Sequence, residues 1–332
     1  MIERRMGRAA TVAMTIACMA GAILSSGTAL AQDYPVRTVH VVVPFPAGGG
    51  ADFMGREIAR KLQQKLKESF VVDNKSGASG MLGTQAVMQS KPDGYTLLLG
   101  TTGTHSTNFA TIPGISYHPL NDFETVSIFA DAPFLLCVNR DVPVTNLKEL
   151  AAYAKANPGK LSHGSSGNGS SAHLGFEALK AALGVSIVHV PYKGLPPAMV
   201  DTIGGHISMT MDSIPSASPH IKSGRVRCIA TGGRQRSPVF PDIPTIAESG
   251  VPGFSIGSWY GLFAPKGTPA SILQKLSGAV QESLNDDDMR TALAQVGADG
   301  LPMTPAESRK YLEDDIARWV KVANDLNIKV TQ

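Results

Sequence analysis

Residues 39–52 read VHVVVPFPAGGGAD. The first five are valine except for His40, a composition that favours a buried strand. A glycine-rich loop and an amphipathic stretch follow, so we expect a helix from about Asp52 to Lys67 with Asp52 as its N-cap. The start of a helix exposes unpaired N–H groups and a partial positive charge, which attract anions. The stretch therefore predicts an α/β fold with an anion site after its first strand.

A second loop has the same design. Residues 165–171 read SSGNGSS and stand between a short strand expected at 161–163 and a helix expected at 172–182. Serine hydroxyls donate hydrogen bonds without adding charge, and glycine lets a ligand approach the backbone closely. Two such loops that face one another can hold a carboxylate or a phosphate without any arginine. Because neither loop shows a catalytic signature, we interpret the chain first as a binder of small anions.

Runs of β-branched residues alternate with amphipathic stretches along the whole chain. This alternation is typical of α/β architecture with largely parallel sheets. We expect further strands at residues 70–73, 95–99, 185–190, 207–211, 226–230 and 258–264. We expect further helices at 145–156, 196–203, 269–284 and 305–326, and one that ends near residue 90.

The last two expected helices have no sheet of their own, so they must pack on an earlier one. This requirement predicts two α/β lobes joined by a hinge. The first lobe comprises residues 32–134 and 258–332, the second comprises 135–257, and the chain crosses near 133–139 and 255–263. A ligand cleft is expected between the lobes, at the carboxyl ends of both sheets.

The N-terminus has the three parts of a secretory signal peptide. Arg4, Arg5 and Arg8 precede an apolar run, and Ala29-Leu30-Ala31 provides a small-x-small cleavage site. Residues 1–31 are therefore interpreted as a signal peptide, and the mature chain as an exported protein. The formal net charge of +3 falls to about +1 without this segment, which gives no reason to expect nucleic acid as a partner.

Two cysteines, Cys137 and Cys228, follow the signal segment, each in a strand-like run. We expect them to be buried and unpaired, although an oxidising compartment would permit a disulfide. The eight histidines are scattered singly, and no cysteine has enough close partners for a metal site. We expect no metal and no other cofactor.

Five linked segments, in this order and spacing, resemble the substrate-binding proteins of tripartite tricarboxylate transporters, also called the Bug family. The segments are VVPFPAGGGAD (42–52), DNKSGASG (73–80), PDGYTL (92–97), GSSGNGS (164–170) and HVPYKG (189–194). The resemblance covers the whole mature chain. Where the family commonly has alanine before the final glycine of the second segment, this chain has Ser79.

The resemblance implies a periplasmic, two-lobed, type II binding-protein fold that closes on a small organic mono- or dicarboxylate and presents it to the integral-membrane permease of such a transporter. It also implies that the two loops hold a carboxylate. The residues carried over are Ala47, Gly48, Gly49 and Asp52 on one side and Ser165, Ser166, Asn168, Ser170 and Ser171 on the other. We expect a monomer that is not an enzyme.

Further candidates come from positions near strand ends. Thr101 and His105 follow the third strand and would meet the far end of the ligand, unless they are ordinary loop polar residues. Asp212 ends a strand and would bond the ligand or a neighbouring loop. The remaining candidates are Phe45 and Tyr192 as walls of the cleft and Lys193 as a countercharge or a solvated lysine.

Three other functions are compatible with parts of the sequence. A serine hydrolase should carry Gly-x-Ser-x-Gly, but residues 164–168 and 77–81 both lack the final glycine. Residues 167–172 match the dinucleotide-binding pattern only weakly, because the strand that follows ends without an acidic residue to bind a ribose hydroxyl. A periplasmic receptor for a membrane sensor kinase stays an alternative to the permease, because both would use closure of the lobes.

Overall fold

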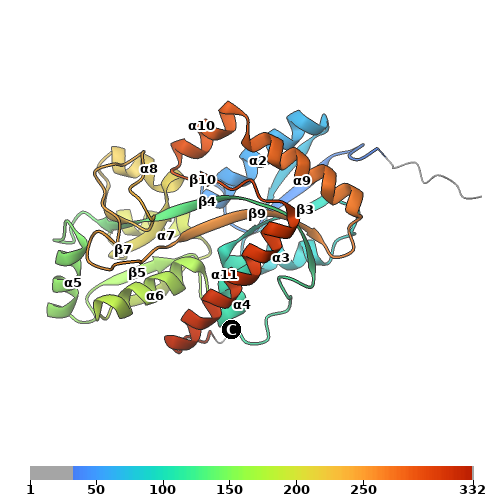
Figure 1. Cartoon of the computed structure of the whole chain (residues 1–332). Helices are drawn as coiled ribbons and strands as arrows, with labels where there is room; N and C mark the ends of the chain where they lie inside the picture. Colours follow the sequence, from blue (N-terminus) through green and yellow to red (C-terminus); the bar gives the residue numbers. More distant parts are fainter. Residues whose placement is uncertain (1–32, 331–332) are drawn as a thin grey trace, which may run out of the picture. The chain divides into compact units, whose positions relative to one another are not determined.

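The computed structural model describes residues 33–330 (Figure 1). The predicted signal peptide lies outside these residues. The strands are β1 (Val39–Val43), β2 (Phe70–Asn74), β3 (Thr96–Thr101), β4 (Phe123–Asn139), β5 (Ser162–Ser165), β6 (Val188–Pro191), β7 (Met209–Ser213), β8 (Val226–Thr231), β9 (Gly257–Pro265) and β10 (Asp299–Gly300). The helices are α2 (Gly50–Leu66), α3 (Met81–Met88), α4 (Asn108–Thr111), α5 (Leu147–Ala156), α6 (Ser171–Leu183), α7 (Leu195–Ile203), α8 (Ile214–Lys222), α9 (Ala270–Leu284), α10 (Asp287–Gln295) and α11 (Pro305–Asp325), with a 3₁₀ segment η1 (Ala78–Gly80) and a π-helical segment η2 (Gly103–Thr107).

The sheet order explains how two α/β lobes arise from one chain. The strands follow the order β2-β1-β3-β9-β4-β7-β5-β6, and β8 and β10 pair with β4. Strands β1 to β3 are parallel, as are β5 to β7, and the antiparallel strands β4 and β9 stand between the two sets. The fold is thus the predicted two-lobed, type II arrangement.

Strand β4 is the physical link between the lobes. Its residues up to Pro133 pair with β9, and those from Phe134 onwards pair with β7 and β8. The return crossing lies where the backbone N–H of Phe134 donates to the carbonyl of Ile256, 3.2 Å away. The residue boundaries assigned to the lobes, 134 and 257, stay a prediction.

Each lobe has its own hydrophobic core. The first includes Phe123, Trp259 and Phe263, and the second includes Phe134 and Phe176. Helix α9 packs beside α2 and on β4, as Figure 1 shows, so the C-terminal helices do pack on the first lobe.

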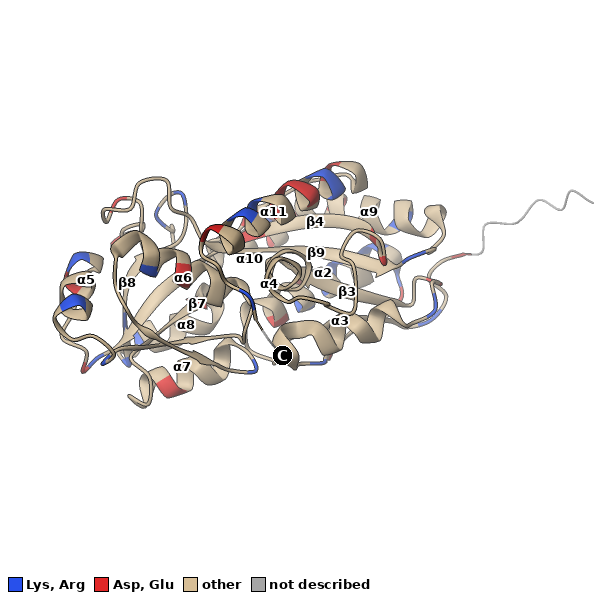
Figure 2. Ribbon diagram, turned by 90° about the horizontal axis from the view of Figure 1, so that it is seen from below, with Lys and Arg blue, Asp and Glu red and all other residues tan. Residues whose placement is uncertain are grey.

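Helix α11 belongs to both lobes. Its residues Leu312 and Ile316 pack in the first core, whereas Trp319 and Ala323 pack in the second. The other face of this helix carries basic and acidic residues interspersed along its length (Figure 2). None of the helices in residues 33–330 is long and apolar enough to span a bilayer.

Two local predictions were wrong. Helix α2 begins at Gly50 with Gly49 as its N-cap, not with Asp52, because the chain already turns helical at the third glycine of the loop. Cys137 and Cys228 form a disulfide and are not free thiols. They stand directly opposite one another on the antiparallel strands β4 and β8, and this cross-strand register was not predictable from either strand alone.

Candidate ligand-binding site

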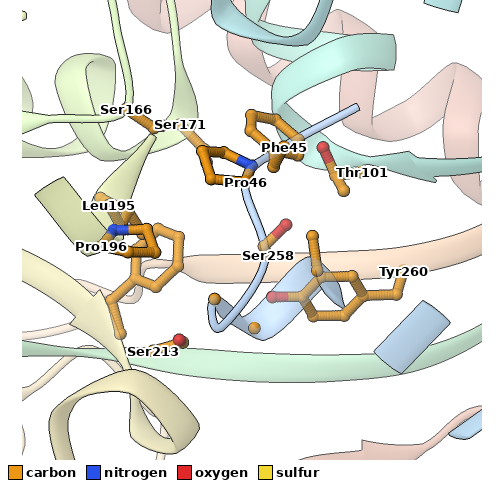
Figure 3. Close-up of a pocket in the computed structure, with 14 residues that line it drawn as sticks. Phe45, Pro46, Thr101, Ser166, Ser171, Leu195, Pro196, Ser213, Ser258 and Tyr260 are labelled. Carbon is orange, nitrogen blue, oxygen red and sulfur yellow. The ribbon is translucent and has the colours of Figure 1, made fainter. Parts of the chain in front are cut away.

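A cavity lies between the two lobes, where the loops after several strands meet (Figure 3). It holds about 440 Å³ of empty space, including the part open to solvent. Its lining consists of Phe45, Pro46, Gly49, Gly50, Ala51, Thr101, Phe134, Ser166, Ser171, Leu195, Pro196, Ser213, Ser258 and Tyr260. None of these residues carries a charge, so any affinity for an anion must come from dipoles and hydrogen-bond donors.

Four helices begin at this cavity. Gly50 starts α2, Ser171 starts α6, Leu195 starts α7, and Ser213 is the N-cap of α8. Each helix start carries a partial positive charge. Among the described residues no acceptor bonds the amides of Gly50 and Ala51, which lie in the first turn of α2. The cavity therefore offers an anion free N–H donors and several positive dipole ends.

The lobes approach each other closely at Gly50. A β-carbon on this residue would lie 2.8 Å from the Ser213 Cβ of the second lobe and 2.8 Å from the Tyr260 Oη of β9. Only glycine fits such a contact without displacement. Burial raises the pKa of Tyr260, so its hydroxyl is a neutral donor near this end of the cavity.

In the second loop, some serines face the cavity and others hold the loop in place. Ser166 and Ser171 line the cavity. Ser165 Oγ accepts a hydrogen bond from the Gly167 amide at 3.1 Å, and Ser170 caps α6 by accepting from the His173 amide at 3.2 Å. The loop is thus preorganised before any ligand arrives.

Histidines scattered along the sequence meet behind this loop. The rings of His173 and His189 stack with centroids 3.9 Å apart, and His163 stacks on Phe176. His189 Nε2 lies 2.6 Å from Ser165 Oγ, and the Gly169 amide donates to His173 Nδ1 at 3.2 Å. Burial lowers the pKa of His189 to about 3, so the ring is neutral at pH 7. These rings brace the second loop from behind.

Asn168 meets the first lobe through its backbone. Its carbonyl accepts a hydrogen bond from Ser79 Oγ at 2.7 Å, and the Ser79 carbonyl accepts one from Asn108 Nδ2 at 2.9 Å. Ser79 has a left-handed backbone with φ of 54°, an uncommon conformation for serine. The pair Ser79 and Asn168 forms a direct bond between the lobes, which we call the interlobe latch.

In the first loop, only part of the predicted set reaches the cavity. Gly49 and Phe45 line it, whereas Ala47 and Gly48 are exposed. The Asp52 carboxylate accepts bonds from the Gly48 amide at 3.0 Å, from Asn74 and from Arg56. Burial favours a higher pKa of Asp52, but these bonds outweigh it and lower the pKa. Asp52 therefore fixes the shape of the loop.

Thr101 lines the cavity, but His105 does not. The His105 ring is fully buried and stacks on Phe263 with centroids 4.1 Å apart. Its Nδ1 lies 2.9 Å from Thr104 Oγ1, and burial lowers its pKa to about 3. The residue belongs to the core of the first lobe.

Tyr192, Lys193 and Asp212 also lie outside the lining. The Tyr192 hydroxyl donates to Asp201 at 2.6 Å, and Lys193 is exposed to solvent. Asp212 is completely buried beside Ser213. No group of three or more potential metal ligands occurs among residues 33–330.

Nine lining residues were absent from the predicted set. They are Pro46, Gly50, Ala51, Phe134, Leu195, Pro196, Ser213, Ser258 and Tyr260. The rule that ligands bind at the carboxyl ends of strands points to Leu195 and Ser213, which follow β6 and end β7. Tyr260 lies in the crossing strand β9, and its inward position depends on pairing with β3 and β4.

Comparison with known proteins identifies the family. Residues 54–328 match the family described as tripartite tricarboxylate transporter family receptor. The chain belongs to the tripartite tricarboxylate transporter receptor family. This receptor is 37% identical to protein BugT of Bordetella pertussis over 301 residues, which cover 90% of this chain and 92% of BugT. The resemblance inferred from the five sequence segments is thereby confirmed.

Two solved structures of relatives were determined with an acid. One is an R. palustris protein with adipate, at a TM-score of 0.86 and 38% identity, over 89% of this receptor and 99% of that chain. The other is MatC from Rhodopseudomonas palustris with bound malate, at a TM-score of 0.82 and 36% identity, over 87% of this receptor and 99% of that chain. This receptor therefore shares its fold with proteins that bind small dicarboxylates.

Proposed function

We propose that this receptor captures a small organic mono- or dicarboxylate in the cavity between its lobes and delivers it to the permease of a tripartite tricarboxylate transporter. The observation that carries the proposal is a cavity without charged side chains at which four helices begin. Such a site favours an anion through amides and dipoles. The adipate and malate of the two relatives support a carboxylate as the anion.

The ligand contacts proposed here come from both lobes. Gly49, Gly50, Thr101 and Tyr260 belong to the first lobe, and Ser166, Ser171 and Ser213 to the second. Phe45 covers the cavity with an apolar ring. Four further predicted residues do not line the cavity. Their hydrogen bonds hold the two loops in the conformation that the ligand meets; they are Asp52, Ser165, Ser170 and Asn168.

Lobe closure would connect binding to delivery. A ligand that touches both lobes favours the closed state by the free energy of the contacts it gains there. A permease that recognises only the closed receptor would then accept only loaded molecules. We propose a periplasmic location, in line with the predicted signal peptide, and a monomeric receptor.

Binding of a panel of organic acids tests the proposal. Differential scanning fluorimetry should show a higher melting temperature with the correct acid, because a ligand at 100 times its Kd adds about 2.7 kcal/mol to stability. The neutral diamide of the same acid is a matched control and should give no shift. If no acid in a broad panel shifts the melting temperature or produces heat in calorimetry, the proposal is wrong.

Uptake measurements test the second half of the proposal. Cells that lack the receptor, or its membrane permease, should lose uptake of the acid that binds in vitro. Uptake that persists without the permease would instead favour a receptor that signals. Hydrolysis of an ester that disappears in Ser166→Ala would contradict a binding function altogether.

A further inference from the structure

A buried acid lies directly behind the anion cavity. Asp212 near the end of β7 has no exposed surface, although its neighbour Ser213 lines the cavity. Its Oδ1 accepts from the Ser213 amide at 2.7 Å, and its Oδ2 accepts from Ser216 Oγ at 2.8 Å. The Ser213 hydroxyl also donates to Oδ1, at 3.4 Å, and all three donors are neutral. Among residues 33–330 no salt bridge is formed by Asp212, so no cation balances its charge.

The surroundings of Asp212 are poor in charge. The titratable group in electrostatic contact with it is Tyr260 of β9, which also interacts with the acid Asp131 of β4. Helix α8 presents Ser216, and α2 presents Gly50 to the adjacent Ser213. On β5, the neighbour of β7, the titratable side chain is His163, whose own titratable neighbours are His189, His173 and Lys180.

A carboxylate bound at the starts of α2 and α8 would add a second negative charge near this acid. Two like charges in a buried site of low dielectric constant repel strongly, and one of them is neutralised by a proton. The ligand carboxylate has free amides and dipole ends around it, whereas Asp212 has three neutral donors from Ser213 and Ser216. The proton is therefore held better by Asp212 than by the ligand.

We propose that Asp212 takes up one proton from solvent when the acid binds, so that the receptor binds its ligand as an anion together with a proton. This inference rests on the proposed function. The proton joins a carboxylate oxygen of Asp212, and Ser216 can then accept the hydrogen bond that it donated before, because a hydroxyl serves both roles.

The affinity of the receptor then depends on pH. Burial raises the pKa of Asp212 to about 7, although hydrogen bonds from Ser216 and Ser213 oppose the shift. Below this pH the proton is already present, and above it each pH unit costs about tenfold in affinity. With an acid that stays ionised throughout, the Kd should rise about 30-fold between pH 6 and pH 8.5.

Calorimetry in two buffers measures the proton directly. Titration of the acid at pH 8 in HEPES and in Tris, which differ in ionisation enthalpy, should show uptake of about 0.9 proton per ligand. In Asp212→Asn the uptake should fall to zero and the Kd should no longer change with pH. Ser216→Ala removes a donor that lowers the pKa of Asp212, so the pH at which affinity declines should move upward.

The outcomes separate this inference from the function on which it rests. Binding by the unmodified receptor with no proton uptake at pH 8 would overturn the role of Asp212 and leave carboxylate binding intact. Proton uptake that persists in Asp212→Asn would assign the proton to another group and would also overturn the role of Asp212. No binding of any acid at any pH would instead contradict the proposed function.

Discussion

Replacing Gly50 by alanine should prevent the lobes from closing on a ligand. The added β-carbon would lie 2.8 Å from Ser213 Cβ and 2.8 Å from Tyr260 Oη, well inside ordinary contact distance. The Ser213 Cβ is attached to the backbone at the start of α8, so rotation of the side chain cannot move it away. The lobes must therefore stay apart by a fraction of an ångström or more.

The size of the effect follows from the cost of overpacking. An extra methyl group in a filled site typically costs about 1–3 kcal/mol. If the closed, liganded state bears this cost, the Kd should rise roughly 5- to 150-fold. The ligand-free receptor should lose less of its free energy of unfolding than the liganded one, because opening of the lobes separates the methyl group from Ser213 and leaves only the Tyr260 hydroxyl of the same lobe to be displaced.

Isothermal titration calorimetry with the bound acid measures the affinity, and chemical unfolding measures the stability. Gly278→Ala is the matched control. Gly278 lies inside α9, and a β-carbon there would meet nothing within 4 Å. This control should keep the affinity and gain about 0.5–1 kcal/mol of stability. A Gly50→Ala receptor that binds the acid as tightly as the unmodified one would refute the reasoning.

Three further predictions concern the latch, the disulfide and the response to acid. Ser79→Ala removes the 2.7 Å bond to Asn168 and should raise the Kd about 2- to 13-fold in calorimetry; an unchanged Kd would show that the interlobe latch adds nothing to closure. Replacing both Cys137 and Cys228 by alanine removes a cross-link between residues 91 positions apart and should lower the free energy of chemical unfolding by roughly 4–5 kcal/mol. Equal stability of this variant and the unmodified receptor would contradict the prediction. The unfolded chain protonates His105 below a pH of 6.5 and the folded chain only near 3, so its contribution to stability is lost as the pH falls through this window. Between pH 7.5 and pH 5 the free energy of unfolding should fall by about 2 kcal/mol less in His105→Phe than in the unmodified receptor. An equal fall in both proteins would contradict this.

Local pattern was sufficient for the elements that frame the site. The valines of β1 and the glycines that follow predicted a strand, a tight loop and a helix, and this is the arrangement that brings Gly49 and Gly50 to the cavity. The same reasoning placed Ser166 and Ser171 in the loop that leads into α6. In both cases the residues that define the backbone conformation are close in sequence to those that line the cavity.

Long-range pairing explains what could not be predicted. Strand β4 runs for 17 residues through both lobes, but Glu124, Ser127 and Pro133 interrupt its apolar pattern, so only its second half was expected. The stretch at 103–107 is rich in polar residues and was interpreted as a loop, yet it is a buried π-helical turn. Tyr260 reaches the cavity only because β9 lies between β3 and β4.

The division of donors between the lobes explains why a charge-free site suits a receptor. An arginine on one lobe would bind the acid in the open state as well as in the closed state, and a ligand shifts an equilibrium only by its difference in affinity for the two states. Here the amides of Gly50 and Ala51 lie on the first lobe, and Ser171 and Ser213 lie on the second. An open lobe would present only part of the set, so in the proposed function most of the binding energy is gained on closure. If the proposed function is correct, the site converts the presence of an acid into a change of conformation, which a charged anchor on a single lobe would do less completely.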